Sequence, residues 1–190
     1  MKRNIITFDK FLPVHTLAVV AALAMGATPA TAATNGTLGA TSTGSVQISI
    51  LVPSRVQITG LSDISFANVE PNAAASSSQN NCVWSNTATK GYTITASGSG
   101  AGGAFTLASA SLTPVPYSVL WNQSSGQTSG TSLTAATAST GFISTATAPG
   151  CATSPSSTSS LTVTIAQPQL QAMPSLTTYT GTLTLLVNPQ

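Results

Sequence analysis

Apolar and polar residues alternate with a period of two in short segments along this 190-residue chain. This period places one apolar face on a β-strand, and Ser or Thr fills most of the polar positions. Turn-rich stretches at 71–81, 97–103, 122–132 and 148–160 separate the segments. No long segment has a helical period, although residues 166–174 could hold one short turn. The sequence therefore predicts an all-β protein, an antiparallel β-sandwich. The segments expected to form its strands are 55–61, 63–69, 91–100, 103–109, 116–121, 141–144, 160–168 and 178–190.

The first 32 residues have the features of a secretory signal peptide. A basic start precedes an apolar run at 17–25, which is too short to span a bilayer. Ala30-Thr31-Ala32 then matches an Ala-x-Ala cleavage site. We predict a signal peptide at 1–32, a flexible leader ending in a strand at 33–53, and a single sandwich domain at 54–190.

Removal of that peptide changes the charge of the chain. Its only histidine, His15, is lost, and the side chains that remain charged are Arg55, Lys90, Asp63 and Glu70, which sum to zero. Nucleic-acid binding needs clustered cations, and Ser–His or Cys–His nucleophiles need a histidine, so we expect neither. Asp63 and Glu70 are only weak candidates for a glycosidase pair, and solvated surface charges are the favoured interpretation. We expect a protein that is not an enzyme and has no cofactor.

Two cysteines remain, Cys82 and Cys151. An even number in an exported chain favours a disulfide, and two cysteines allow one pairing. A metal site is not expected, because two thiols without a histidine cannot complete a tetrahedral zinc site.

The two tryptophans have different expected roles. Trp121 lies in register with Tyr117 and Val119, so we expect it in the core. Trp84 lies in a polar stretch, and both packing and exposed sugar stacking stay open for it. The scarcity of charge also has two interpretations, a Thr-rich solvated shell or strand edges that a partner covers, and we favour the second.

Regular apolar alternation marks both the segment that precedes the expected domain and the segment that ends it. Residues 44–53, GSVQISILVP, follow a leader of Gly, Thr, Ser and Ala and have no obvious sheet of their own. The last alternating segment runs almost to the C-terminus, where a further covering strand would be expected in a closed sandwich.

This arrangement resembles a subunit of a chaperone–usher pilus. Residues 45–53 resemble the donor strand of colonisation-factor type fimbrial subunits, residues 115–123 resemble their Trp-bearing strand, and residues 178–187 resemble their closing strand. Residues 63–100 look more like the related spore coat protein U-like pilins. Together these matches cover most of residues 45–190.

The resemblance implies an immunoglobulin-like sandwich that lacks its last strand and is completed by a donor strand from another chain. The implied donor residues are Val46, Ile48, Ile50 and Val52. The residues implied to border the acceptor groove and bind the chaperone are Tyr179, Leu183, Leu185, Val187 and Gln190.

The implied function is that of a structural subunit of a surface fimbria, supporting adhesion and biofilm formation. Its implied partners are further copies of itself, a periplasmic chaperone, an outer-membrane usher and a possible tip adhesin. The implied route runs through the periplasm to the cell surface. A secreted carbohydrate-binding adhesin or lectin-like module stays open as the alternative.

Overall fold

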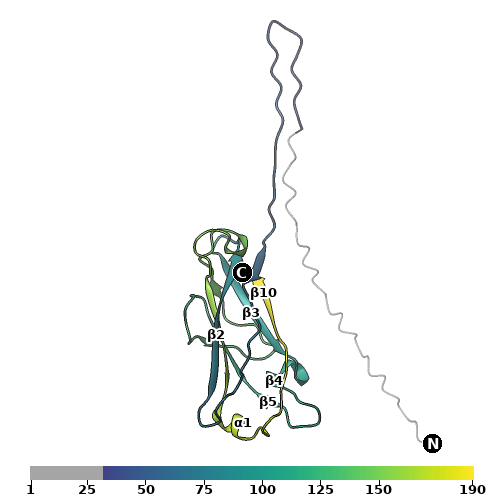
Figure 1. Cartoon of the computed structure of the whole chain (residues 1–190). Coiled ribbons are helices and arrows are strands. Elements are labelled where there is room, and N and C mark those ends of the chain that lie inside the picture. Colours follow the sequence, from purple (N-terminus) through teal and green to yellow (C-terminus); the bar gives the residue numbers. More distant parts are fainter. Residues whose placement is uncertain (1–31) are drawn as a thin grey trace, which may run out of the picture. The chain divides into compact units, whose positions relative to one another are not determined.

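The structure is a computed structural model that describes residues 32–190 (Figure 1). All but the last residue of the expected signal peptide therefore lies outside the described residues. The chain divides into two units, with the boundary between Leu51 and Val52. Among the described residues, no helix is long and apolar enough to cross a membrane.

The described part of the first unit contains one local pairing. Thr34 and Ser45 exchange two backbone hydrogen bonds, both of 2.9 Å, and their hydroxyl oxygens lie 2.6 Å apart. This antiparallel bridge closes a loop within the leader that composition alone describes as flexible. Residues 46–51 follow the bridge without a strand assignment.

The second unit contains a five-stranded and a three-stranded antiparallel sheet. The larger sheet has the order β1-β2-β9-β6-β7. Its strands are β1 (Val56–Thr59), β2 (Ala75–Ser85), β9 (Ser159–Ile165), β6 (Ser118–Asn122) and β7 (Thr131–Ser132).

The smaller sheet has the order β10-β3-β8. Its strands are β10 (Leu183–Pro189), β3 (Gly91–Gly98) and β8 (Phe142–Ile143). A separate pair, β4 (Thr106–Leu107) and β5 (Val115–Pro116), and three short helical turns, η1 (Ala101–Gly103), η2 (Pro149–Cys151) and α1 (Gln167–Gln171), complete the unit.

Apolar side chains from both sheets form one core between them. The larger sheet contributes Val83, Val119, Trp121, Leu161 and Val163, and the smaller contributes Tyr92, Ile94, Ala96 and Phe142. These residues follow the predicted alternation at 91–98 and 117–121, and Trp121 is fully buried as expected. The predicted all-β antiparallel sandwich is therefore confirmed.

The prediction for residues 71–81 is wrong. This stretch was expected to be turn-rich, but most of it lies in β2, which has 11 residues and lies between β1 and β9. The hydroxyl of Ser76 lies 2.9 Å from that of Thr164, and the hydroxyl of Ser78 lies 2.7 Å from that of Thr162. These hydroxyl pairs lie on the face of the sheet that points away from the core. The positions that face the core are Ala75, Ser77, Gln79 and Asn81, so the sequence has no apolar alternation that would mark a strand.

Two other expected strands differ in the structure. Residues 63–69 form no strand, although Ile64 and Phe66 still pack against the core from a loop. The last strand begins at Leu183 and not near Tyr179. In both places the alternation correctly indicates which side chains face inward. The backbone, however, does not form a continuous set of hydrogen bonds with a neighbouring strand there.

Candidate functional site: an open seam between two edge strands

The last strand, β10, lies at the edge of its sheet. It pairs with β3 along its whole length, from Leu183 opposite Gly98 to Pro189 opposite Tyr92. No strand formed by residues 32–190 follows on its other side in the sheet order. Leu183, Leu185 and Val187 are partly buried and pack against the core, while Leu186 on the outer face is exposed.

The first strand of the sandwich, β1, is also an edge strand. It pairs with β2, with Val56 opposite Ser85 and Thr59 opposite Cys82. In the described part of the chain, no strand follows on its other side in the sheet order. Val56 and Ile58 are partly buried against the same core. Gly60, with a φ of 76°, follows directly after the strand in a left-handed conformation that glycine adopts without strain.

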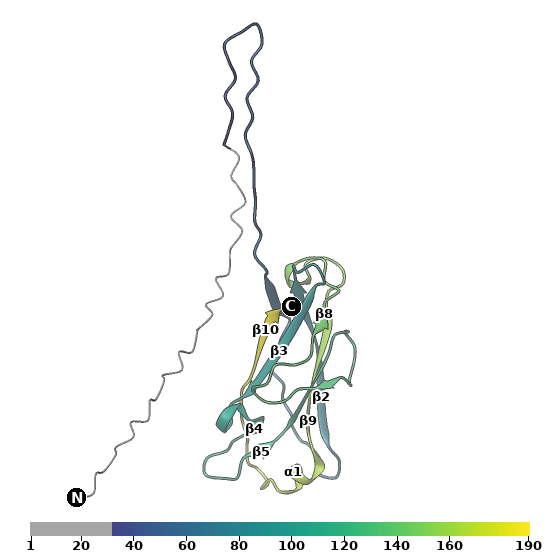
Figure 2. The same cartoon turned by 180° about the vertical axis from the view of Figure 1, so that it is seen from behind.

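These two edge strands are neighbours although they belong to different sheets. Figures 1 and 2 both place the dark-blue β1 beside the yellow β10, and their Cα atoms approach within 8 Å. We call this side of the sandwich the open seam. Its apolar side chains, each partly buried against the core, are Val56, Ile58, Leu183, Leu185 and Val187.

The alternation of hydrogen-bonded and non-hydrogen-bonded residue pairs shows which backbone groups of β10 point away from β3. Gln190 donates its backbone N–H to the carbonyl of Gly91 at 3.0 Å, so these residues form a hydrogen-bonded pair. Bonded and non-bonded pairs alternate in an antiparallel ladder. The backbone groups of Leu183, Leu185 and Val187 therefore point away from β3, toward the unpaired edge.

The core-facing residues of β1 likewise direct their backbone groups toward the unpaired edge. Asn86 donates its N–H to the carbonyl of Arg55 at 3.1 Å, which makes Arg55 and Asn86 a bonded pair. Val56 and Ile58 then direct their backbone groups away from β2. Both edges thus combine outward hydrogen-bonding groups with side chains that face the core, which is what an added strand needs to extend a sheet.

The expected donor residues are all exposed in the structure. Their exposed fractions are 73% for Val46, 88% for Ile48, 90% for Ile50 and 67% for Val52. No strand is assigned to this segment, although its alternation predicts one. A strand forms its backbone hydrogen bonds only when a second strand lies beside it, so the sequence pattern alone does not produce one here.

The expected acceptor residues do not all lie together. Leu183, Leu185 and Val187 share the open seam, but Tyr179 packs in a separate cluster with Val115, Ile165 and Leu170. Gln190 continues the pairing of β10 with β3, and the hydroxyl of Thr89 donates to its carbonyl at 3.4 Å. The structure therefore does not bring Tyr179 into the seam, and Gln190 lies at its C-terminal end.

Cys82 and Cys151 form the expected disulfide, with a Cα–Cα distance of 5.9 Å. The bond lies in a small buried cluster with Ala146, and the partly buried Trp84 packs against this cluster. Cys82 alternates with the core residue Val83, so the disulfide holds η2 against the outer face of β2. It lies beside β1, because Cys82 is opposite Thr59 and η2 also contacts β1, but on the face of the larger sheet that points away from the core.

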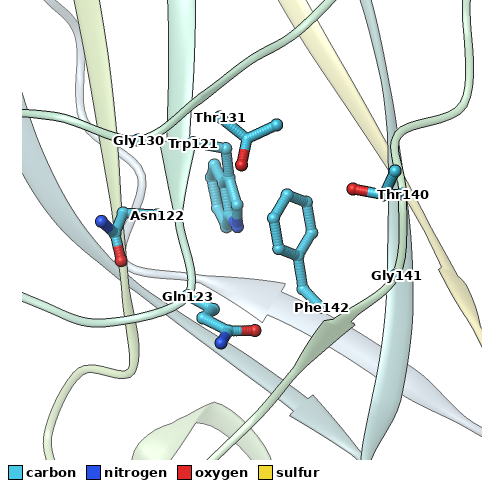
Figure 3. A pocket seen from close by; sticks show the side chains of 8 residues that line it. All are labelled: Trp121, Asn122, Gln123, Gly130, Thr131, Thr140, Gly141 and Phe142. Atoms are coloured by element: carbon cyan, nitrogen blue, oxygen red, sulfur yellow. The ribbon is translucent and has the colours of Figure 1, made fainter.

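A cavity of about 370 Å³ lies beside the end of β6 (Figure 3). Its walls include the Trp121 indole and the Phe142 ring, but both residues are buried. The Asn122 amide binds the backbone of Ser124 and Ser129, each at 2.9 Å. Gln123 likewise accepts a hydrogen bond from the backbone of Ile143 at 2.9 Å. Sugar stacking needs exposed aromatic faces, and neither the Trp121 nor the Phe142 ring offers one here.

No protein-family model and no curated protein sequence matches the chain. One solved structure that is similar to it is described as "Chaperone-tip adhesin complex is vital for synergistic activation of CFA/I fimbriae biogenesis". The TM-score is 0.45 and the sequence identity 14%, over 71% of this chain. This chain spans 41% of the length of the matched chain.

Proposed function

We propose that this protein is a structural subunit of a surface fimbria that polymerises by donor-strand exchange. The observation that carries the proposal is the open seam, where β1 and β10 each have one unpaired edge above partly buried apolar side chains. The same chain carries an exposed segment, 46–52, whose apolar residues alternate with the period that such a seam requires.

In the proposed assembly, residues 46–52 of one copy lie along the unpaired edge of β10 in the next. Val46, Ile48, Ile50 and Val52 then face the core, and the outward backbone groups of β10 gain partners. Burying four such side chains stabilises the junction by roughly 6 to 12 kcal/mol before the cost of ordering the segment. That range suffices for a fibre without covalent links between its subunits.

The wider proposal covers export and partners. A periplasmic chaperone covers the seam before assembly, an outer-membrane usher exports the growing fibre, and a tip adhesin is a further candidate partner. The fibre then supports adhesion and biofilm formation at the cell surface. The role is structural and not enzymatic, because Asp63 and Glu70, the two carboxylate side chains of the exported chain, are both exposed and lie outside any pocket lining described above.

Adjacent residues of the donor segment offer a matched test. Ile48→Asp places a carboxylate on the face that enters the seam, whereas Ser49→Asp places the same charge on the opposite face. Burial of an unpaired carboxylate costs several kcal/mol, so we expect Ile48→Asp to abolish fibres and Ser49→Asp to leave them visible by electron microscopy. Both variants should still co-purify with the chaperone, which binds β10.

A synthetic peptide of residues 44–53 provides a second test on the full chain. Added in excess, it should occupy the seam and stop fibre growth, whereas the same peptide with Ile48→Asp should not. Loss of chaperone binding in Ile48→Asp, or equal fibre yields from the two aspartate variants, would show that residues 46–52 do not act as the donor strand.

A further inference from the structure

The junction between the donor segment and β1 is held by one residue. Pro53, Ser54 and Arg55 connect the segment to β1, and Asn86 follows directly after β2. The Asn86 side chain accepts a hydrogen bond from the Arg55 N–H at 2.6 Å and donates one to the Pro53 carbonyl at 2.9 Å. Its backbone N–H donates to the Arg55 carbonyl at 3.1 Å. Three hydrogen bonds thus extend the β2 pairing past the end of the β1 ladder.

The sequence by itself permits a competing arrangement within one chain. A hairpin with 53–55 as its loop would pair Val52 with Val56 and Ile50 with Ile58 along the unpaired edge of β1. Residues opposite each other in an antiparallel pair lie on the same face. The donor residues would therefore face the core in the correct register, and the chain would close its own seam.

The observed junction opposes that hairpin. Three-residue hairpin loops commonly place their third residue in the left-handed region, which here is Arg55. That region favours glycine, and Arg55 is not among the described residues with positive φ. Closing the hairpin would also turn the Arg55 N–H and the Pro53 carbonyl away from the Asn86 amide.

We infer that Asn86 holds the junction extended and thereby prevents the chain from filling its own seam, so that a second copy of the chain is its preferred donor. This inference rests on the proposed function, since it assumes that residues 46–52 fit the seam. Asn86 would thus be a positioning residue that favours pairing between two copies of the chain over pairing of the donor segment with its own domain.

The other end of β1 supplies a matched control. The Gln79 side chain accepts hydrogen bonds from the N–H and hydroxyl of Ser62 at 2.8 and 2.9 Å, and donates to the Ser62 carbonyl at 3.1 Å. Gln79 lies within β2, whereas Asn86 follows directly after it, and both side chains are amides with a similar number of hydrogen bonds. Gln79, however, contacts the chain after the C-terminal end of β1, away from the junction with the donor segment. Gln79→Ala therefore removes comparable bonds without changing the exit of the donor segment.

The test compares four full exported chains, residues 33–190, as dilute monomers: wild type, Asn86→Ala, Asn86→Ala with Arg55→Gly, and Gln79→Ala. Hydrogen exchange is measured for the amides of 46–52 and of Val56 and Ile58. We expect at least tenfold slower exchange there in Asn86→Ala, a larger effect in the double variant, and wild-type behaviour in Gln79→Ala. The slow-exchanging monomers should also form fibres more slowly.

Unchanged exchange in both Asn86 variants would overturn the inference, as would an equal change in Gln79→Ala. Slow exchange of the β3 amides reports whether each variant is folded. If Asn86→Ala fails to fold, Asn86→Asp replaces it, because it keeps the acceptor for Arg55 but loses the donor to Pro53. Its exchange rates at 46–52 should lie between those of wild type and those expected for Asn86→Ala. Binding of the 44–53 peptide to wild type tests the proposed function separately. Peptide binding with unchanged exchange in the variants would overturn the role of Asn86 alone.

Discussion

The indole N–H of Trp121 donates a hydrogen bond of 3.2 Å to the hydroxyl of Tyr92, between the two sheets of the sandwich. Trp121 lies on β6 in the larger sheet, and Tyr92 lies on β3, which also pairs with β10. Both residues are fully buried, and the Tyr92 ring contacts that of Phe142 with centroids 5.7 Å apart. This polar link lies in the same core that the open seam borders.

This link predicts a loss of stability at alkaline pH. Burial raises the pKa of Tyr92 from 10.0 to about 12, although the hydrogen bond from Trp121 acts in the opposite direction. Between these values the unfolded chain releases a proton that the folded chain retains, so stability is complete below pH 10 and falls as the pH rises toward 12. The expected loss from this group is about 2 to 3 kcal/mol.

Urea unfolding between pH 8 and pH 12 measures this dependence. In Tyr92→Phe the alkaline loss should shrink, while stability near pH 8 falls by about 1 to 3 kcal/mol because the Trp121 donor is left unpaired. Tyr117→Phe is the control for the loss near pH 8, since Trp121 donates to Tyr92 and not to Tyr117. Burial also raises the pKa of Tyr117, so its alkaline loss should shrink too, while its stability near pH 8 should not fall through an unpaired Trp121 donor. An unchanged alkaline slope in Tyr92→Phe would exclude Tyr92 as its source.

The disulfide predicts a large effect on stability. Cys82 and Cys151 are separated by 69 positions, and a cross-link of this span stabilises the folded state by about 4 kcal/mol in the chain-entropy account. The double variant Cys82→Ala and Cys151→Ala should therefore unfold at a much lower urea concentration. Mass spectrometry of the wild type without reductant should detect no free thiol, and two free thiols would contradict the pairing.

Leu185 and Leu186 offer a matched pair on β10. Leu185 is partly buried and faces the core, whereas Leu186 is 56% exposed on the outer face. We expect Leu185→Ala to cost about 1 to 2 kcal/mol of stability and to weaken binding of the 44–53 peptide at least tenfold. Leu186→Ala should stay within about 0.5 kcal/mol and bind normally.

Urea unfolding and peptide titration by fluorescence or calorimetry separate these two effects. If the two variants bind the peptide equally well, then the core-facing side of β10 is not the surface that the donor segment contacts.

The sequence by itself determined which side chains face inward. The alternation at Tyr92, Ile94 and Ala96, and that at Leu183, Leu185 and Val187, can be interpreted locally because the period of a strand is a property of its backbone. The disulfide also followed from the sequence, since the chain has two cysteines and these allow one pairing.

Only the tertiary structure decided which strand edges stay unpaired. The place of β2 between β1 and β9 comes from its pairing with residues 159–165, far away in the sequence. The inward positions of its first half, Ala75, Ser77, Gln79 and Asn81, leave no apolar period in 75–81 that would predict this pairing. The separation of Tyr179 from Leu183 and the contacts of Asn86 with Pro53 and Arg55 likewise depend on long-range register. A local pattern fixes the face of a strand, but its neighbours are fixed by the free energy of the whole packed sheet.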